Sequence, residues 1–89
     1  MASSPKLLDT IALLSDLPSH RLQLVEPEYA ALSHLPQGLI GTVVEVYPSG
    51  KPHYLVEFAD EQGCEYAMAT LQASEFLILY AELPLSLAS

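Results

Sequence analysis

The sequence has few basic residues and one cysteine, and each scarcity excludes a group of functions. Only Lys6, Arg21 and Lys51 oppose eleven acidic residues, which gives a net charge of −8. Proteins bind nucleic acids and anionic lipid surfaces largely through Lys and Arg. We therefore expect neither nucleic acid nor a membrane as a partner. The single cysteine, Cys64, excludes an internal disulfide and any metal site built from several cysteines.

Long hydrophobic runs and a leader pattern are also missing. The apolar residues are dispersed, and no run approaches the roughly 20 residues that a membrane span needs. The first six residues lack the basic stretch followed by an apolar segment that marks a signal peptide. Together with the lone thiol, these features predict a cytoplasmic protein.

Apolar residues are in excess, because 51% of the 89 residues are hydrophobic. A chain of this length buries only about two thirds of its unfolded surface, so its core is modest. Part of the excess is therefore expected on the surface. A protein partner could cover it, or a second copy of the chain in a homodimer.

Strand-like runs separated by turn residues predict an all-β domain. The five main runs are residues 6–14, 39–47, 52–59, 64–70 and 75–80. Short strands at this spacing predict a small antiparallel barrel or sandwich. The domain is expected to span residues 6–80, with flexible ends at residues 1–5 and 81–89.

A long segment, residues 21–36, separates the first two main strands. Residues 21–25 alternate like a strand, and residues 27–32 fit one helical turn with Pro27 at its first position. Long excursions in small barrels often carry function, although a tolerated insertion is an equal alternative.

The third and fourth strand runs permit a register argument. Glu57 must reach water, so its neighbours Val56 and Phe58 are expected to point inward. A loop at residues 61–63 pairs Phe58 with Tyr66, and such a loop favours a left-handed residue at its end, where Gly63 stands. The inward residues of the two strands are then Tyr54, Val56, Phe58, Cys64, Tyr66 and Met68. The full predicted core is Leu8, Ile11, Leu13, Val44, Val46, Val56, Phe58, Tyr66, Met68 and Leu77.

Three segments resemble a known family. Residues 38–44, Gly-Leu-Ile-Gly-Thr-Val-Val, are similar to the strand entry of SH3-like and KOW-type barrels. The wider pattern consists of residues 7–18, residues 41–47, and residues 54–58 running to 70–71. In that order it resembles a small bacterial family of uncharacterised function that is common in cyanobacteria. The resemblance covers residues 6–80 and implies a five-stranded SH3-like barrel with no known catalytic residues.

A more distant resemblance is to SH3-like accessory proteins of photosynthetic electron transport, such as the small E-type component of photosystem I. Residues 26–29 precede residues 41–43 and then 54–58 in a similar order. Those accessory proteins help to dock ferredoxin through basic residues. This chain has only three basic residues, so the resemblance does not extend to that role.

No constellation of side chains predicts catalysis, a cofactor or a metal. Cys64 is expected on the inward face as a structural thiol. The three histidines have no recognised ligand spacing with each other or with Cys64. Asp9 and Asp16 are interpreted as turn-forming or outward residues rather than as a paired acid and base. We therefore expect a protein that is not an enzyme.

The remaining signal is acidic. Like charges crowded on a sheet cost stability, so they indicate either a solubilising face or a docking surface for a basic partner. The residues expected to take part are the acidic Glu45, Glu57, Asp60, Glu61 and Glu65 and the apolar Leu24, Tyr29, Leu32 and Leu35. The favoured function is a non-enzymatic binding or accessory module. The alternatives are an antitoxin or immunity-type protein that neutralises a basic toxin, and a KOW-like RNA- or ribosome-associated module.

Overall fold

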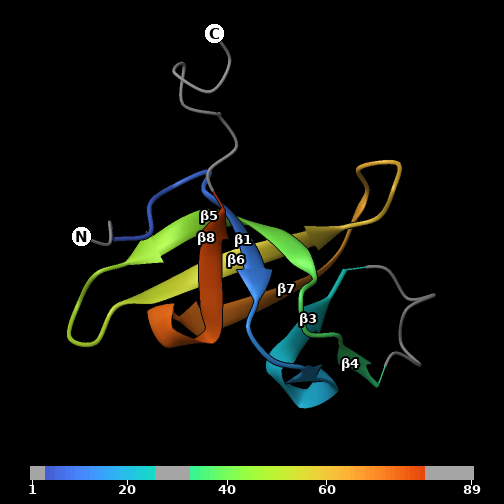
Figure 1. Cartoon of the computed structure of the whole chain (residues 1–89), viewed down its shortest axis with the longest axis horizontal. Coiled ribbons are helices and arrows are strands. Elements are labelled where there is room, and N and C mark those ends of the chain that lie inside the picture. Colours follow the sequence, from blue (N-terminus) through green and yellow to red (C-terminus); the bar gives the residue numbers. More distant parts are fainter. Residues whose placement is uncertain (1–3, 26–32, 80–89) are drawn as a thin grey trace, which may run out of the picture.

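The computed structural model describes residues 4–25 and 33–79 and shows an antiparallel all-β domain (Figure 1). Its strands are β1 (Thr10–Leu13), β2 (Leu17–Pro18), β3 (Leu22–Leu24), β4 (His34–Leu35), β5 (Ile40–Tyr47), β6 (His53–Ala59), β7 (Glu65–Gln72) and β8 (Phe76–Leu79). Two turns of 3-10 helix, η1 (Ser19–Arg21) and η3 (Ala73–Glu75), precede β3 and β8. The prediction of an all-β class is confirmed, and each of the five predicted main runs contains a strand.

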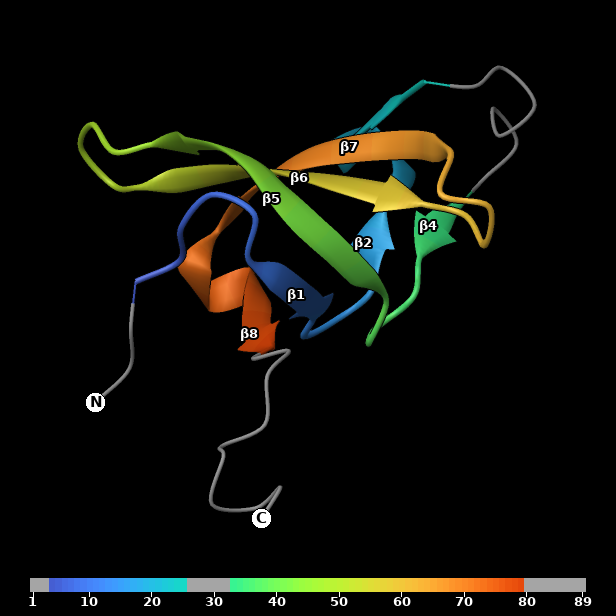
Figure 2. The same cartoon turned by 90° about the horizontal axis from the view of Figure 1, so that it is seen from above.

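Six strands form one curled sheet in the order β3-β7-β6-β5-β1-β8, and β2 pairs with β4 beside it. Figure 2 shows β5 running across the sheet from the long hairpin with β6 to its pairing with β1. In the described part of the chain no ladder joins β3 to β8, so the sheet curls without closing. The predicted small antiparallel all-β domain is thus confirmed, with six strands in place of five, a barrel that is not closed, and a small two-stranded sheet beside it.

The core lies on the concave side of the sheet and is centred on β6. Tyr54, Val56 and Phe58 alternate along this strand and are all buried, as the charge of Glu57 predicts. Opposite them the chain needs a glycine, because a Cβ on Gly41 would lie only 2.7 Å from Val56 Cγ1 and 3.0 Å from the backbone oxygen of Glu57. Gly41 therefore lets β5 cross the core at close range. The rest of the core comprises Ile11, Leu13, Leu17, Leu35, Val43, Ala67, Ala69, Leu71 and Phe76.

A β-bulge at Tyr66 overturns the predicted face of β7. Phe58 faces Ala67, whereas the next residue of β6, Ala59, faces Glu65, so Tyr66 is the additional residue on β7. One additional residue exchanges the two faces of the strand beyond it. As a result β7 buries Ala67, Ala69 and Leu71, and the predicted inward set of Cys64, Tyr66 and Met68 is wrong. Cys64 is exposed, Met68 is half-buried, and Tyr66 packs against the edge of the core.

A second bulge lies at Val44 in β5 and corrects another part of the predicted core. Val43 faces Val56, and Glu45 faces Leu55, so Val44 is the additional residue between them. Val43 is fully buried, Val44 is only half-buried, and Val46 packs against the core from its border.

Two predicted core leucines are exposed. Leu8 has a left-handed backbone with φ 70°, which places it in a turn before β1 and leaves 76% of it exposed. Leu77 alternates with the buried Phe76, so it faces out of the sheet. Ile11 and Leu13, by contrast, are buried as predicted.

The long segment between β1 and β5 is partly anchored to the sheet. Leu17 of β2 faces Leu35 of β4, and both side chains are buried. The predicted alternation at residues 21–25 is confirmed as β3, which pairs with β7. The helical turn expected at residues 27–32 lies outside the described residues. Within those residues, no helix has the length and apolar character that crossing a bilayer would demand.

Gly63 has φ 82°, so the predicted left-handed residue at the end of the β6–β7 loop is confirmed. No atom would lie within 4 Å of a Cβ at this position, so only the backbone conformation opposes a side chain here. We expect Gly63→Val to lower the free energy of unfolding by about 1–2 kcal/mol, because a β-branched residue resists positive φ.

Chemical denaturation of both Gly63→Val and Gly63→Asn measures this effect. Asn tolerates the left-handed region, so Gly63→Asn should retain most of the wild-type stability. Equal stability of the valine variant and the wild type would contradict the assignment of this turn.

Candidate functional site

Carboxylates gather on the convex face of β5–β6–β7 and on the loop that joins β6 to β7. Glu57 faces Thr42 on one side and Met68 on the other, and Glu45 faces Leu55. We name the set Glu45, Glu57, Asp60, Glu61 and Glu65 the acidic surface. The side-chain alternation that buries the Tyr54–Phe58 row is what places Glu57 on the opposite, solvent side of β6.

Glu57 and Glu65 interact directly. A hydrogen bond to the Glu65 carboxyl raises the pKa of Glu57, with smaller contributions from partial burial and from the charge of Glu65. Two carboxylates held this close repel each other, and no cation of the described residues offsets that repulsion here. Glu65 lies opposite Ala59, whose side chain is on the same face of β6 as that of Glu57.

Asp60 has a structural function in the same region. Its Oδ1 accepts hydrogen bonds from the backbone N–H of Gln62 at 2.9 Å and of Cys64 at 3.0 Å. The loop is also closed by backbone bonds from Asp60 N–H to the Cys64 carbonyl and from Gly63 N–H to the Asp60 carbonyl, both 2.9 Å. Asp60 therefore shapes the hairpin, whereas Glu61, the other acidic residue of the loop, accepts none of these hydrogen bonds.

The basic residues are engaged elsewhere. Lys6 Nζ lies 3.5 Å from Asp9 Oδ1, and the Arg21 guanidinium pairs with Glu75. These two are the ion pairs that Lys and Arg make within the described segments. Lys51 lies in the turn between β5 and β6, at the opposite end of the hairpin from Asp60. No cation of the described part therefore neutralises the acidic surface.

Arg21 and Glu75 form a clasp that the sequence did not reveal. The guanidinium donates from Nη1 to Glu75 Oε2 and from Nη2 to Oε1, both at 3.0 Å, and Nη2 also donates to the Thr70 carbonyl at 3.2 Å. Glu75 Oε1 in turn accepts the Gln72 backbone N–H at 2.9 Å. The hydrogen bonds from Arg21 lower the pKa of Glu75 and raise that of Arg21. The partners are 54 residues apart, and no local pattern links them.

The predicted apolar contributors are divided by the structure. Leu24 is 38% exposed at the end of β3, next to the exposed Val25, whose N–H donates to the Tyr66 carbonyl at 2.9 Å. Leu24 faces the buried Ala67, so its side chain lies on the concave side of the sheet, and of the two only Val25 borders the acidic surface at Glu65. Leu35 is 1% exposed and belongs to the core, so it offers nothing to a partner. Tyr29 and Leu32 lie outside the described residues.

The other candidate residues take structural positions. Asp16 Oδ1 accepts the Gln37 backbone N–H at 2.8 Å, and Asp9 Oδ2 accepts that of Lys6 at 3.0 Å, as expected for turn-forming residues. His34 contacts Ser33 through Nδ1 at 2.9 Å. Across residues 4–25 and 33–79, no group of three or more His, Cys, Asp or Glu side chains is arranged to hold a metal ion.

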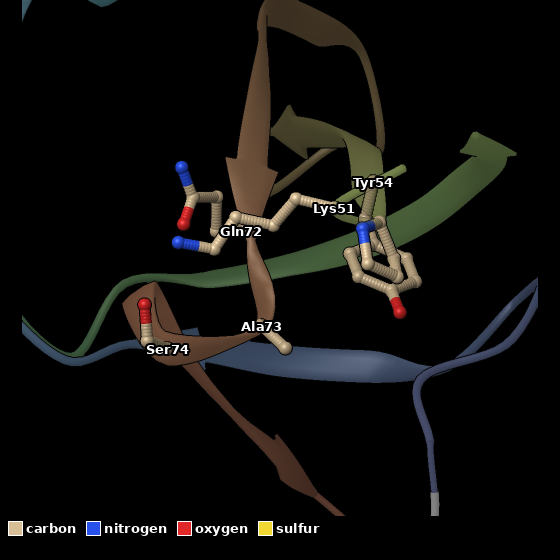
Figure 3. Close-up of a pocket in the computed structure, with 6 residues that line it drawn as sticks. Lys51, Tyr54, Gln72, Ala73 and Ser74 are labelled. Carbon is tan, nitrogen blue, oxygen red and sulfur yellow. The ribbon is translucent and has the colours of Figure 1, made fainter. Parts of the chain in front are cut away.

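An open pocket of about 330 Å³ lies between the β5–β6 turn and η3. Its lining residues are Lys51, Pro52, Tyr54, Gln72, Ala73 and Ser74. Figure 3 shows the Lys51 side chain extending towards Gln72, with the Tyr54 ring on the other side. The Tyr54 ring makes an edge-to-face contact with the Phe76 ring, and their centroids are 5.7 Å apart. The pocket is separate from the acidic surface, and its bordering cation makes it a poor site for a basic group.

The Arg21–Glu75 clasp should make stability depend on pH. Because the pKa of Glu75 is lowered in the folded state, its contribution is fully present above the unfolded pKa of about 4.5 and is lost as the pH falls through the folded value. We expect Glu75→Gln to cost about 1–2 kcal/mol at pH 7, since it replaces charge-assisted hydrogen bonds in a pair whose side chains are 35% and 28% exposed. Urea denaturation from pH 7 to pH 3 should show the difference from wild type shrinking. A constant difference would contradict an ionic contribution.

The Glu57–Glu65 contact should make stability depend on pH in the opposite direction. The pKa of Glu57 is raised in the folded state, so stability is lost as the pH rises through that pKa. We expect Glu57→Gln to be more stable than wild type at pH 7, by less than about 1 kcal/mol because solvent screens the pair. The advantage should vanish below the carboxyl pKa. Glu65→Gln should give the same gain, and the double variant no more than either, whereas additive gains would exclude a shared contact.

Comparison with known proteins identifies a family but no function. No curated protein and no solved structure matches the chain at a significant level. One family model matches residues 7–78, which include every strand from β1 to β7 and most of β8. The chain therefore belongs to the family described as a domain of unknown function, DUF4926.

Proposed function

We propose that this chain is a non-enzymatic protein-binding module that docks a basic partner through its acidic surface. The observation that carries the proposal is that Glu57 and Glu65 lie beside each other on one face of neighbouring strands, while none of the basic residues of the described part lies there. A folded domain has many positions for eleven acidic residues. Placing two of them in mutual contact on an exposed sheet costs stability.

A basic partner would convert this cost into binding free energy. An approaching Lys or Arg side chain favours the charged form of both carboxyl groups, so it would relieve their mutual repulsion on binding. Complementary charge of this kind mainly accelerates encounter and selects against acidic partners. The exposed Val25, whose N–H donates to the Tyr66 carbonyl next to Glu65, supplies an apolar contact that would slow dissociation.

The competing functions fit the charge less well. An RNA- or ribosome-associated role needs cations along the bound backbone, and two of the three in this chain are held by carboxylates of their own fold. An antitoxin or immunity-type protein would use the same acidic surface, and it is distinguished by its partner, a basic toxin whose activity the chain would abolish. The resemblance to a largely cyanobacterial family makes a cyanobacterial extract the first source of partner to test.

The test compares binding kinetics of two variants with equal change in net charge. The partner is first isolated on the immobilised chain. Association is then measured at low and high salt for Glu57→Gln/Glu65→Gln and for the control Ser15→Lys/Ser49→Lys, whose exposed positions lie outside the acidic surface. We expect the first variant to slow association about threefold to tenfold at low salt and to flatten the salt dependence.

The control should associate like wild type at physiological salt, where screening confines charge effects to about 8 Å. Wild-type kinetics for both variants would exclude the acidic surface as the docking site. Equal slowing of both would show a general effect of net charge and would equally overturn the proposal.

A further inference from the structure

Another part of the convex face, across β5, β1 and β8, differs from the acidic surface because it carries no charge. On the convex side of β5–β1–β8, Ala12 of the central strand faces Ile40 on one side and Leu77 on the other. Ile40 is 49% and Leu77 54% exposed. In antiparallel strands, residues that face each other lie on the same side of the sheet. These three side chains therefore form one apolar row across three strands.

The neighbouring row is uncharged as well. Thr10 of β1 lies between Thr42 of β5 and Leu79 of β8. Two consecutive rows across the three strands thus contain no charged residue, in a chain whose net charge is −8. Large exposed apolar residues that are contiguous rather than scattered indicate a contact surface.

The same face ends at an open strand edge. β8 is the last strand of the six-stranded sheet and, among the described elements, pairs only with β1 (Figure 2). The Leu14 N–H donates to the Glu75 carbonyl at 3.0 Å, directly before the β1–β8 ladder. In an antiparallel ladder every second residue of a strand hydrogen-bonds to the same neighbour, so after Glu75 the backbone groups of Leu77 and Leu79 bond to β1. The N–H and C=O groups of Phe76 and Ile78 consequently point away from it, towards the open edge.

The sequence of β8 gives this edge no protection. Natural edge strands avoid pairing with other chains by carrying Lys, Pro or other charged residues, by bulges or by being very short. β8 reads Phe-Leu-Ile-Leu, without a charge or a proline, and its ladder with β1 is regular over four residue pairs. The other edge strand, β3, is shorter and has three residues.

We propose that β8 pairs with β8 of a second copy of this chain, antiparallel and about a two-fold axis through Leu77. In this register Phe76 of each copy faces Ile78 of the other, and the edge groups of these residues make four backbone hydrogen bonds. Leu77 of one copy lies beside Leu77 of the other, so the apolar rows of the two sheets become continuous. This inference does not depend on the proposed function.

A second copy fits this edge better than an unrelated strand for two reasons. The register is self-complementary, because the two-fold places each edge donor opposite an edge acceptor. Charge also restricts self-association, since two acidic copies repel each other wherever carboxylates meet. The convex rows of β5–β1–β8 are uncharged, and in the sheet order β5 and β1 separate β8 from β6.

The first test is sedimentation equilibrium of the full chain over a range of concentrations. We expect the mass of wild type to rise to twice the monomer value of 9.7 kDa. Leu77→Lys should remain at the monomer mass, because it brings two charges together at the axis. Val25→Lys is the matched control, since Val25 is similarly exposed but follows β3 at the other edge, and it should dimerise like wild type.

Amide hydrogen exchange at low and high concentration then tests the backbone pairing itself. The amides of Phe76 and Ile78 should become at least tenfold better protected in the dimer, and this gain should be absent in Leu77→Lys. A monomeric wild type at all concentrations overturns the proposal, and so does dimerisation of Leu77→Lys or loss of the dimer in both lysine variants. Protection of Ile78 that does not depend on concentration would show that one chain covers its own edge, which also overturns it.

Discussion

The two β-bulges are the constraint on which the arrangement of this sheet depends. The large side chains of β6 need small partners on β7, and the bulge at Tyr66 provides them by placing Phe58 opposite Ala67 and Val56 opposite Ala69. Without it, Phe58 would face Tyr66 and Val56 would face Met68. Four large side chains would then compete for a core that also excludes a Cβ at Gly41. Packing volume therefore determines the register, and the register determines which residues reach the surface.

This dependence explains which parts of the structure could be predicted from the sequence. The strands, the inward face of β6 and the left-handed Gly63 follow from local patterns of alternation and turn chemistry. The inward face of β7 could not be predicted in this way, because the alternation of inward and outward residues does not reveal where an additional residue is inserted. The small residues Ala67 and Ala69 were the available signal, and they indicate the correct face only once they are set against Phe58 and Val56.

The candidate site was predictable to a similar extent. Alternation places both Glu57 and Glu65 on the outward face of neighbouring strands, whereas the hydrogen bond between their carboxyl groups follows only from the folded structure. Leu35 was misassigned to the surface because its partner, Leu17, lies 18 residues earlier in a two-residue strand with no periodicity of its own. The Arg21–Glu75 clasp joins the start of β3 to the turn before β8, and only the folded chain brings these segments together.

The distribution of the few cations connects stability with surface chemistry. Arg21 and Lys6 each pair with a carboxylate that also accepts a backbone N–H, so both stabilise the fold and neither pairs with a carboxylate of the acidic surface. The acidic surface is in this sense a consequence of how the fold uses its basic residues. The uncharged convex rows at β8 complement it, because an acidic chain can associate with itself only where its carboxylates are absent. A two-fold contact at that edge would leave both acidic surfaces accessible, since β1 and β5 lie between β8 and β6 in each copy. Such a pair would present two docking surfaces in fixed relation, and a partner with two suitably spaced basic patches would gain from the higher effective concentration of the second contact.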